Sequence, residues 1–348
     1  MTAFAYYRLP YLHHAHYVAQ REGEPEVLSS VAELNGKEGF VIAPFSPSSD
    51  CPVLLIHPDE SKLLPISDAK AISTSDSTLG EDASDRDAYA GAFECFHQEL
   101  EKGTFRKIVL ARKATVRTAD KDFENLFMKA CRMYPRLFVS LVYTPQSGMW
   151  LMATPEILLK GEQGNMSTMS LAGTQKAEPS RTVADYPVEG VEWSRKNQEE
   201  QQYVTDYIED CIKAFSDDYQ LKGPYTTMAA NLYHLRTDIS FRLRNEGRLG
   251  DVIDALYPTP AVCGIPKDEA RRFILQHEHQ PRKYYSGFVG PVSPQGKTHL
   301  FVSLRCMNIL PDGTCELYAG GGLLKESEME KEWKETEAKM QTIRRVLL

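Results

Sequence analysis

Residues 298–322, near the end of the chain, read THLFVSLRCMNILPDGTCELYAGGG. Two apolar runs flank Pro311-Asp312-Gly313, and this turn chemistry predicts a β-hairpin. The run YYSGFVGPVS at 284–293 precedes them and ends at a second turn, Pro294-Gln295-Gly296. The tail is therefore expected to form a β-meander, with one continuous strand through 298–310. Arg305 interrupts the apolar side chains of that strand.

Similar patterns extend outward through the chain. Strands are expected at 105–116, 137–144, 149–154 and 228–243, with a further hairpin over 157–174. Amphipathic helices are expected near 86–102, 122–135, 193–215, 250–258, 270–277 and 326–346. Runs of strands with long helices between and after them predict an α+β fold with mainly antiparallel sheets.

Composition narrows the class of protein. The chain has 348 residues, 42% hydrophobic and 25% charged, which is typical of a soluble globular protein with one large domain or two smaller ones. A net charge of −8 argues against a nucleic-acid partner. No apolar run reaches membrane-spanning length, and the N-terminus lacks a signal-peptide pattern. Seven cysteines without a CxxC motif indicate reduced thiols, so a cytoplasmic location is expected.

Residues 67–87, SDAKAISTSDSTLGEDASDRD, are rich in Ser and Asp and poor in apolar side chains. This composition predicts a flexible connection. It divides the chain into an N-terminal part, 1–85, and a part at 86–348 that carries nearly all of the candidate chemistry.

Two helices carry carboxylates beside their apolar faces. On the helix at 193–215, Glu200 lies one turn before Val204 on the same face. On the last helix, Glu332, Glu335 and Lys339 follow the flank of the apolar stripe. Carboxylates at a buried margin are costly unless they are paired or bind a cation. The pattern suggests an oxygen-ligand site for a hard metal such as Mg²⁺, and solvated charge on the helix edges is the alternative.

An acid and a base are suggested by Lys107 and Glu156. Lys107 lies in the apolar strand KIVLAR, where lost solvation would make it a usable base. Glu156 follows an apolar strand directly, where a low-dielectric wall can keep a carboxyl protonated as a general acid. We expect the two residues to lie on neighbouring strands. An edge lysine facing water and an ordinary turn glutamate are the alternatives.

Arg305 and the glycines that end the last strand suggest an anion site. A buried arginine requires a carboxylate, which could belong to the protein or to a substrate. The backbone N–H groups of Gly320 and Gly321 could approach an anion, although such a glycine run is more often a flexible connection. His234 lies on an apolar strand and therefore needs a polar partner.

Taken together, these segments resemble the chorismate-utilising enzymes. The matching motifs, in chain order, are Lys107 in KIVLAR, Thr154-Pro155-Glu156, Leu171-Ala172-Gly173-Thr174, Glu200 in SRKNQEEQQYV, His234-Leu235-x-Thr237, Tyr257-Pro258-Thr259-Pro260-Ala261, Arg282-x-x-Tyr285-x-Gly287, Arg305, Ala319-Gly320-Gly321-Gly322 and Glu332-x-x-Glu335. Order and spacing match from about residue 86 to the end. The resemblance implies one α+β domain of two large, mainly antiparallel sheets packed together, with helices outside.

The resemblance also implies roles for these residues. Mg²⁺ would bridge the ring carboxylate of chorismate to Glu200 and Glu335, with Glu332 near the metal or bound through water. Arg305, Tyr285 and the backbone of Gly320 and Gly321 would hold the pyruvyl carboxylate, and Lys339 would lie near the ring carboxylate. The other implied substrate-binding residues are Ala172, Gly173, Thr174, His234 and Thr259.

Two positions narrow the expected reaction to isochorismate synthesis. Lys107 resembles the water-activating base of isochorismate and salicylate synthases, and Ala172 stands where aminodeoxychorismate synthases can carry a nucleophilic lysine. A salicylate synthase is the nearest alternative. An anthranilate or aminodeoxychorismate synthase, which would use ammonia and a glutaminase partner, and a non-catalytic chorismate-binding relative fit less well. No glutaminase partner is expected. The product would feed menaquinone or siderophore biosynthesis.

The helix at 193–215, which carries Glu200, differs from the family pattern at two positions. Asn197 stands where an acidic residue is usual, and Gln201 where histidine is usual. Contacts around the metal are expected to differ there.

Overall fold

The computed structural model describes residues 3–66, 83–118, 122–176, 188–229 and 232–348. They form two nine-stranded sheets in which every pairing is antiparallel. The order of the first sheet is β14-β7-β18-β17-β9-β8-β1-β2-β6, and that of the second is β12-β13-β11-β10-β16-β15-β4-β5-β3. The predicted α+β fold is confirmed.

The strands of the first sheet are β1 (Ala3–Arg8), β2 (His14–Gln20), β6 (Glu60–Pro65), β7 (Lys107–Arg117), β8 (Phe138–Thr144), β9 (Gly148–Thr154), β14 (Gly264–Ile265), β17 (Cys306–Ile309) and β18 (Thr314–Leu323). Those of the second are β3 (Glu26–Leu28), β4 (Gly39–Ala43), β5 (Val53–Ile56), β10 (Ile157–Glu162), β11 (Asn165–Lys176), β12 (Tyr219–Ala229), β13 (Leu232–Arg242), β15 (Phe288–Val292) and β16 (Lys297–Val302). Residues before the Ser/Asp-rich stretch therefore contribute three strands to each sheet.

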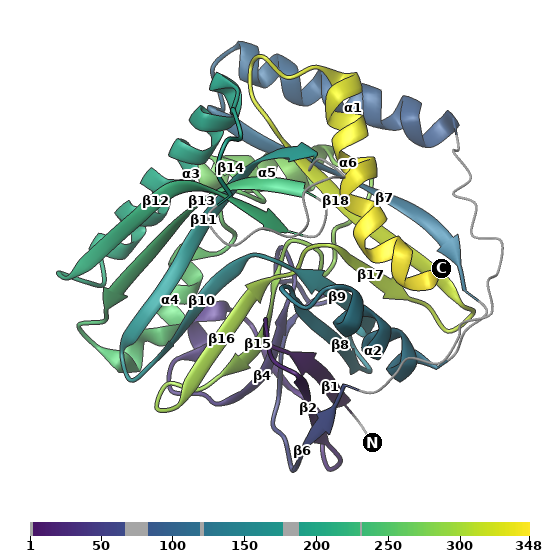
Figure 1. Cartoon of the computed structure of the whole chain (residues 1–348), viewed down its shortest axis with the longest axis vertical. Helices are drawn as coiled ribbons and strands as arrows, with labels where there is room; N and C mark the ends of the chain where they lie inside the picture. The colour runs from purple at the N-terminus through teal and green to yellow at the C-terminus, as the bar shows by residue number, and fades with distance from the viewer. Residues whose placement is uncertain (1–2, 67–82, 119–121, 177–187, 230–231) are drawn as a thin grey trace.

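The helices are α1 (Ala83–Glu101), α2 (Phe123–Met133), α3 (Arg195–Lys213), α4 (Leu249–Leu256), α5 (Lys267–His277) and α6 (Met329–Arg344). In Figure 1, α1, α2 and α6 pack on strands of the first sheet, and α3 and α4 on strands of the second. Between the sheets, the rings of Phe138 in β8 and Phe301 in β16 stack at 4.1 Å. Burial of such large side chains between the two layers drives the packing.

The chain crosses between the sheets twice at one place. It leaves β9 of the first sheet and enters β10 of the second through Pro155 and Glu156. It returns from β16 to β17 through residues 303–305. The crossings are bonded to each other: Ala153 N–H donates to the Arg305 carbonyl at 3.2 Å, and Val302 N–H donates to the Glu156 carbonyl at 2.9 Å. Glu156 and Arg305 therefore lie together at the seam of the two sheets.

The continuous strand predicted for 298–310 is wrong for this reason. Arg305 has a left-handed backbone, with φ of +48°, and lies in the crossing instead of inside an apolar strand. The tail is not one meander, because β15 and β16 belong to one sheet and β17 and β18 to the other.

Two other boundaries also differ. The single strand expected at 228–243 is the second arm of a hairpin, because β12 precedes it and Gly223-Pro224 interrupts the apolar alternation of β12. Helix α1 begins at Ala83, so residues 83–87 of the predicted connection are helical, and 67–82 lie outside the described residues. No helix in the described part of the chain is long and apolar enough to cross a bilayer.

Candidate active site

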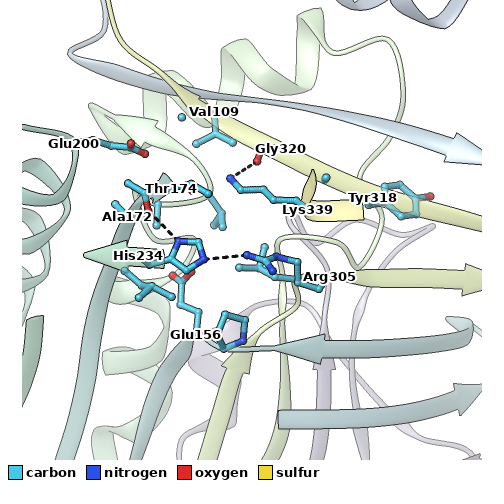
Figure 2. Close-up of a pocket in the computed structure, with 18 of the residues that line it drawn as sticks. Val109, Glu156, Ala172, Thr174, Glu200, His234, Arg305, Tyr318, Gly320 and Lys339 are labelled. Carbon is cyan, nitrogen blue, oxygen red and sulfur yellow. Dashed lines mark hydrogen bonds between the residues drawn. The ribbon is translucent and has the colours of Figure 1, made fainter. Parts of the chain in front are cut away.

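A pocket at the seam gathers most of the predicted site residues (Figure 2). The predicted residues that line it are Glu156, Ala172, Gly173, Thr174, Glu200, His234, Tyr285, Arg305, Gly320 and Lys339. The remaining ones do not line it. Lys107, Thr259 and Glu335 contact the lining residues Glu200, Glu156 and Lys339, and Gly321 and Glu332 lie next to Glu335. The pocket walls come from both sheets and from α3 and α6.

Glu156 projects from the first crossing and is almost completely buried. Thr259 Oγ1 donates a hydrogen bond to its Oε1 at 3.3 Å. Burial raises the pKa of Glu156 to about 7, although Lys107 and the Thr259 hydrogen bond act in the opposite direction. The carboxyl can therefore carry a proton near neutral pH, which a general acid requires.

Lys107, the first residue of β7, has a completely buried side chain. Its Nζ lies 2.9 Å from Oε1 of Glu200, which reaches across from α3. Gly322 leaves room for this ion pair, because a Cβ there would lie 2.3 Å from Glu200 Oε1 and 2.8 Å from Lys107 Cε. The expectation that Lys107 and Glu156 lie on neighbouring strands is wrong, since β18 and β17 separate β7 from β9.

Arg305 and His234 form one hydrogen-bonded unit, drawn in Figure 2. Arg305 donates to His234 Nε2 at 3.2 Å, and His234 Nδ1 lies 2.9 Å from the Gly173 carbonyl. Because a guanidinium can only donate, Nε2 must accept and Nδ1 must carry the proton. Burial and the neighbouring Arg305 lower the pKa of His234 to about 3, so the ring is neutral. The second arm of Arg305 donates to Thr342 Oγ1 at 3.2 Å.

Glu332 and Glu335 are also paired with lysine ammonium groups. Lys196 Nζ lies 2.5 Å from Glu332 Oε1, and Lys339 Nζ lies 2.6 Å from Glu335 Oε1. Lys339 also donates to the Gly320 carbonyl at 2.9 Å. Together with Lys107 and Glu200 these residues form three ion pairs, which we call the three Lys–Glu pairs.

The donor set suits a hard divalent cation, because all three acidic groups offer carboxylate oxygens. Glu332 and Glu335 both approach Gly321, where a Cβ would lie 3.0 Å from Glu332 Oε2 and 3.9 Å from Glu335 Oε1. Glu332 Oε2 is buried without a hydrogen-bond partner in the described part of the chain. However, no group of three or more His, Cys, Asp or Glu side chains is poised around a metal position among the described residues. The carboxylates are instead oriented toward their lysines.

The two residues of α3 that differ from the family pattern, Asn197 and Gln201, have different surroundings. Gln201 Nε2 donates to Ser170 Oγ at 2.7 Å, so its amide is directed at β11. Asn197 packs against Gly173, where a Cβ would approach its side chain to 3.2 Å. Sequence reasoning missed Lys196 and Thr342. For Lys196 the signal was its position one turn before Glu200 on the same helix face.

Comparison with known proteins identifies the family of the chain. The family model described as chorismate binding enzyme matches residues 55–348, and the chain belongs to this family. The family resemblance inferred from the motifs is thereby confirmed.

Two relatives and one solved structure are similar to the chain. It is 30% identical over 268 residues to the salicylate biosynthesis isochorismate synthase of Pseudomonas aeruginosa, covering 71% of this chain and 52% of the relative. It is 30% identical over 267 residues to the isochorismate synthase MenF of Escherichia coli, and the match covers 76% of this chain and 61% of the relative. The chain thus spans little more than half the length of these relatives. The structure of the menaquinone-specific isochorismate synthase from Escherichia coli superimposes with a TM-score of 0.81 at 22% identity. The superposition covers 99% of this chain and 89% of that structure.

The buried Lys107–Glu200 pair leads to a stability prediction. Glu200→Gln should lower the free energy of unfolding by about 3–5 kcal/mol, because it leaves the buried Lys107 charge without a partner. The double variant Lys107→Met/Glu200→Gln should recover most of that loss, because both charges are gone. Urea unfolding in the presence of EDTA measures the free energy of unfolding of Lys107→Met, of Glu200→Gln and of the double variant. Additive losses in the double variant would show that the pair is not coupled.

Proposed function

We propose that the chain is an isochorismate synthase, which converts chorismate to isochorismate with Mg²⁺ as cofactor. The observation that carries the proposal is the buried carboxyl of Glu156, whose pKa is about 7, in one pocket with Arg305 and close to Lys107. An acid, a base and a carboxylate-binding arginine are the groups that this reaction needs. The names of the relatives support the same reaction.

Substrate binding rests on Arg305. Its guanidinium is oriented by His234 and Thr342, so a fork of N–H donors can face the pyruvyl carboxylate of chorismate. Tyr285, which stacks on Tyr318 at 5.6 Å, and the backbone of Gly320 lie on the same wall. The neutral ring of His234 adds no second positive charge to this wall.

The acid and base then divide the chemistry. Lys107 takes a proton from a water molecule that attacks ring C2, and Glu156 gives a proton to the C4 hydroxyl as it leaves as water. The ring double bonds shift between these carbons, so one water enters and one departs. Lys107 can act as a base only as the neutral amine, so its own proton must first pass to solvent water, and loss of the contact with Glu200 would favour that release.

The three carboxylates, Glu200, Glu332 and Glu335, would hold Mg²⁺. When bound, the metal ion would fix the ring carboxylate of the substrate and spread its charge. No glutaminase partner is required, since the nucleophile is water. Ala172 provides no amine at the position where aminodeoxychorismate synthases can carry a lysine.

The product formed from chorismate tests the proposal. With Mg²⁺ and no ammonia donor, the purified protein should form isochorismate, detected by chromatography and mass spectrometry. Salicylate plus pyruvate would instead identify a salicylate synthase. Anthranilate formed only after ammonium is added would favour ammonia chemistry, and no product under either condition would favour a non-catalytic relative.

The acid–base assignment predicts a pH effect. Because Glu156 acts as an acid, its protonated form is active, so kcat should fall as the pH rises through about 7. Lys107→Ala and Glu156→Gln should each lower kcat by about 10²–10⁴-fold. The remaining kcat of Glu156→Gln should no longer decrease as the pH rises through about 7. The same alkaline fall in that variant would assign the titration to another group.

The Arg305 assignment predicts a selective loss of binding. Arg305→Lys keeps the charge but removes the planar fork, so the KM for chorismate should rise by about 10–150-fold, the equivalent of a lost charged hydrogen bond. Melting temperature and KM are measured on the same preparation. A lower melting temperature with an unchanged KM would make Arg305 a structural residue of the crossing.

A further inference from the structure

We propose that Lys196 is a built-in competitor for the metal site, a lysine whose ammonium group occupies Glu332 and must leave before a divalent cation binds. Its release would therefore set the affinity of the site for the metal. This inference rests on the proposed function of the three carboxylates as metal ligands.

The geometry places Lys196 at the open side of the site. It is the second residue of α3, and its Nζ lies 2.5 Å from Oε1 of Glu332 on α6. The Glu332 side chain is only 2% exposed, whereas that of Lys196 is 26% exposed. The carboxylate is thus fixed inside the protein, while the ammonium group reaches it from the solvent side and has a route back to water.

The other two lysines are held more firmly. The Lys107 side chain has no exposed surface, so an ammonium group that left Glu200 would remain buried in the protein. Lys339 has a second bond, to the Gly320 carbonyl, that would retain it if Glu335 turned to a metal ion. The hydrogen bond found for Lys196 Nζ within the described part of the chain is the one to Glu332. Lys196 is therefore the ammonium group that a cation can displace at least cost.

The charge of Lys196 acts on the whole site. Its ammonium group contacts Glu332 directly, and Lys196 lies one turn before Glu200 on α3. Three carboxylates balanced by three ammonium groups have little net charge with which to attract a cation. Removing the charge of Lys196 makes the site more negative by one charge and leaves a buried carboxylate oxygen of Glu332 without its partner.

Magnesium binding to the full-length, EDTA-treated protein without substrate tests this proposal. Isothermal titration calorimetry should show that Lys196→Met binds Mg²⁺ about tenfold or more tightly than the unmodified chain, because no charged hydrogen bond has to be broken. In EDTA, Lys196→Met should melt at a lower temperature, since Glu332 has lost its partner, and Mg²⁺ should raise its melting temperature more than that of the unmodified chain. Equal or weaker Mg²⁺ binding by Lys196→Met would overturn the proposal.

Two variants on the same helix turn serve as controls. Arg195→Met removes a positive charge from a side chain that is 91% exposed and paired with Glu199, so Mg²⁺ affinity should change little. Lys196→Arg keeps the charge and should bind Mg²⁺ no more tightly than the unmodified chain. An equal gain in Arg195→Met would show that general charge, and not the Glu332 contact, sets the affinity.

Glu335→Gln separates failure of this inference from failure of the proposed function. If Glu335→Gln loses Mg²⁺ binding while Lys196→Met binds as the unmodified chain does, the metal site stands and the role of Lys196 is wrong. If Glu335→Gln binds Mg²⁺ normally, the carboxylates are not the metal ligands, and both proposals fail.

Discussion

The balance of buried charge at the seam between the sheets is the constraint on which the rest of the site depends. Carboxylates cannot remain ionised in a low-dielectric interior without partners. Three Lys–Glu pairs meet this requirement, and the pair of Lys107 and Glu200 is the most deeply buried of them. Glu156 lies outside these pairs, and burial therefore raises its pKa to about 7. The same seam thus holds three carboxylates paired with ammonium groups and one buried carboxyl outside these pairs.

The backbone places these groups by crossing between the sheets twice at one point. Because the two crossings are hydrogen-bonded to each other, the position of Glu156 is tied to that of Arg305. Arg305 is oriented in turn by His234 and Thr342, which lie on β13 and α6. Elements from both sheets therefore define the pocket, and neither sheet alone could form it.

Much of this arrangement could be predicted from the sequence, because periodicity and turn residues reveal strands and helices one at a time. The carboxylate faces of α3 and α6 were visible in the same way. The crossing at Arg305 could not be predicted from the sequence, because an apolar strand that passes from one sheet to the other keeps the alternation of a single strand. Lys196 was missed because its partner Glu332 is 136 residues away in the chain, and only the fold brings the two together. The functional roles came from the order of motifs along the chain, which a single motif could not have provided.

In the proposed reaction, Lys107 and Glu156 together add one water molecule to the ring and remove another. Running the reaction in ¹⁸O-labelled water tests it most directly. Isochorismate should then contain one ¹⁸O atom, located in the C2 hydroxyl, and unreacted chorismate should gain label only through the reverse reaction. Isochorismate without ¹⁸O would mean that the hydroxyl migrates within the substrate, which would contradict the role of Lys107 as the base that activates water.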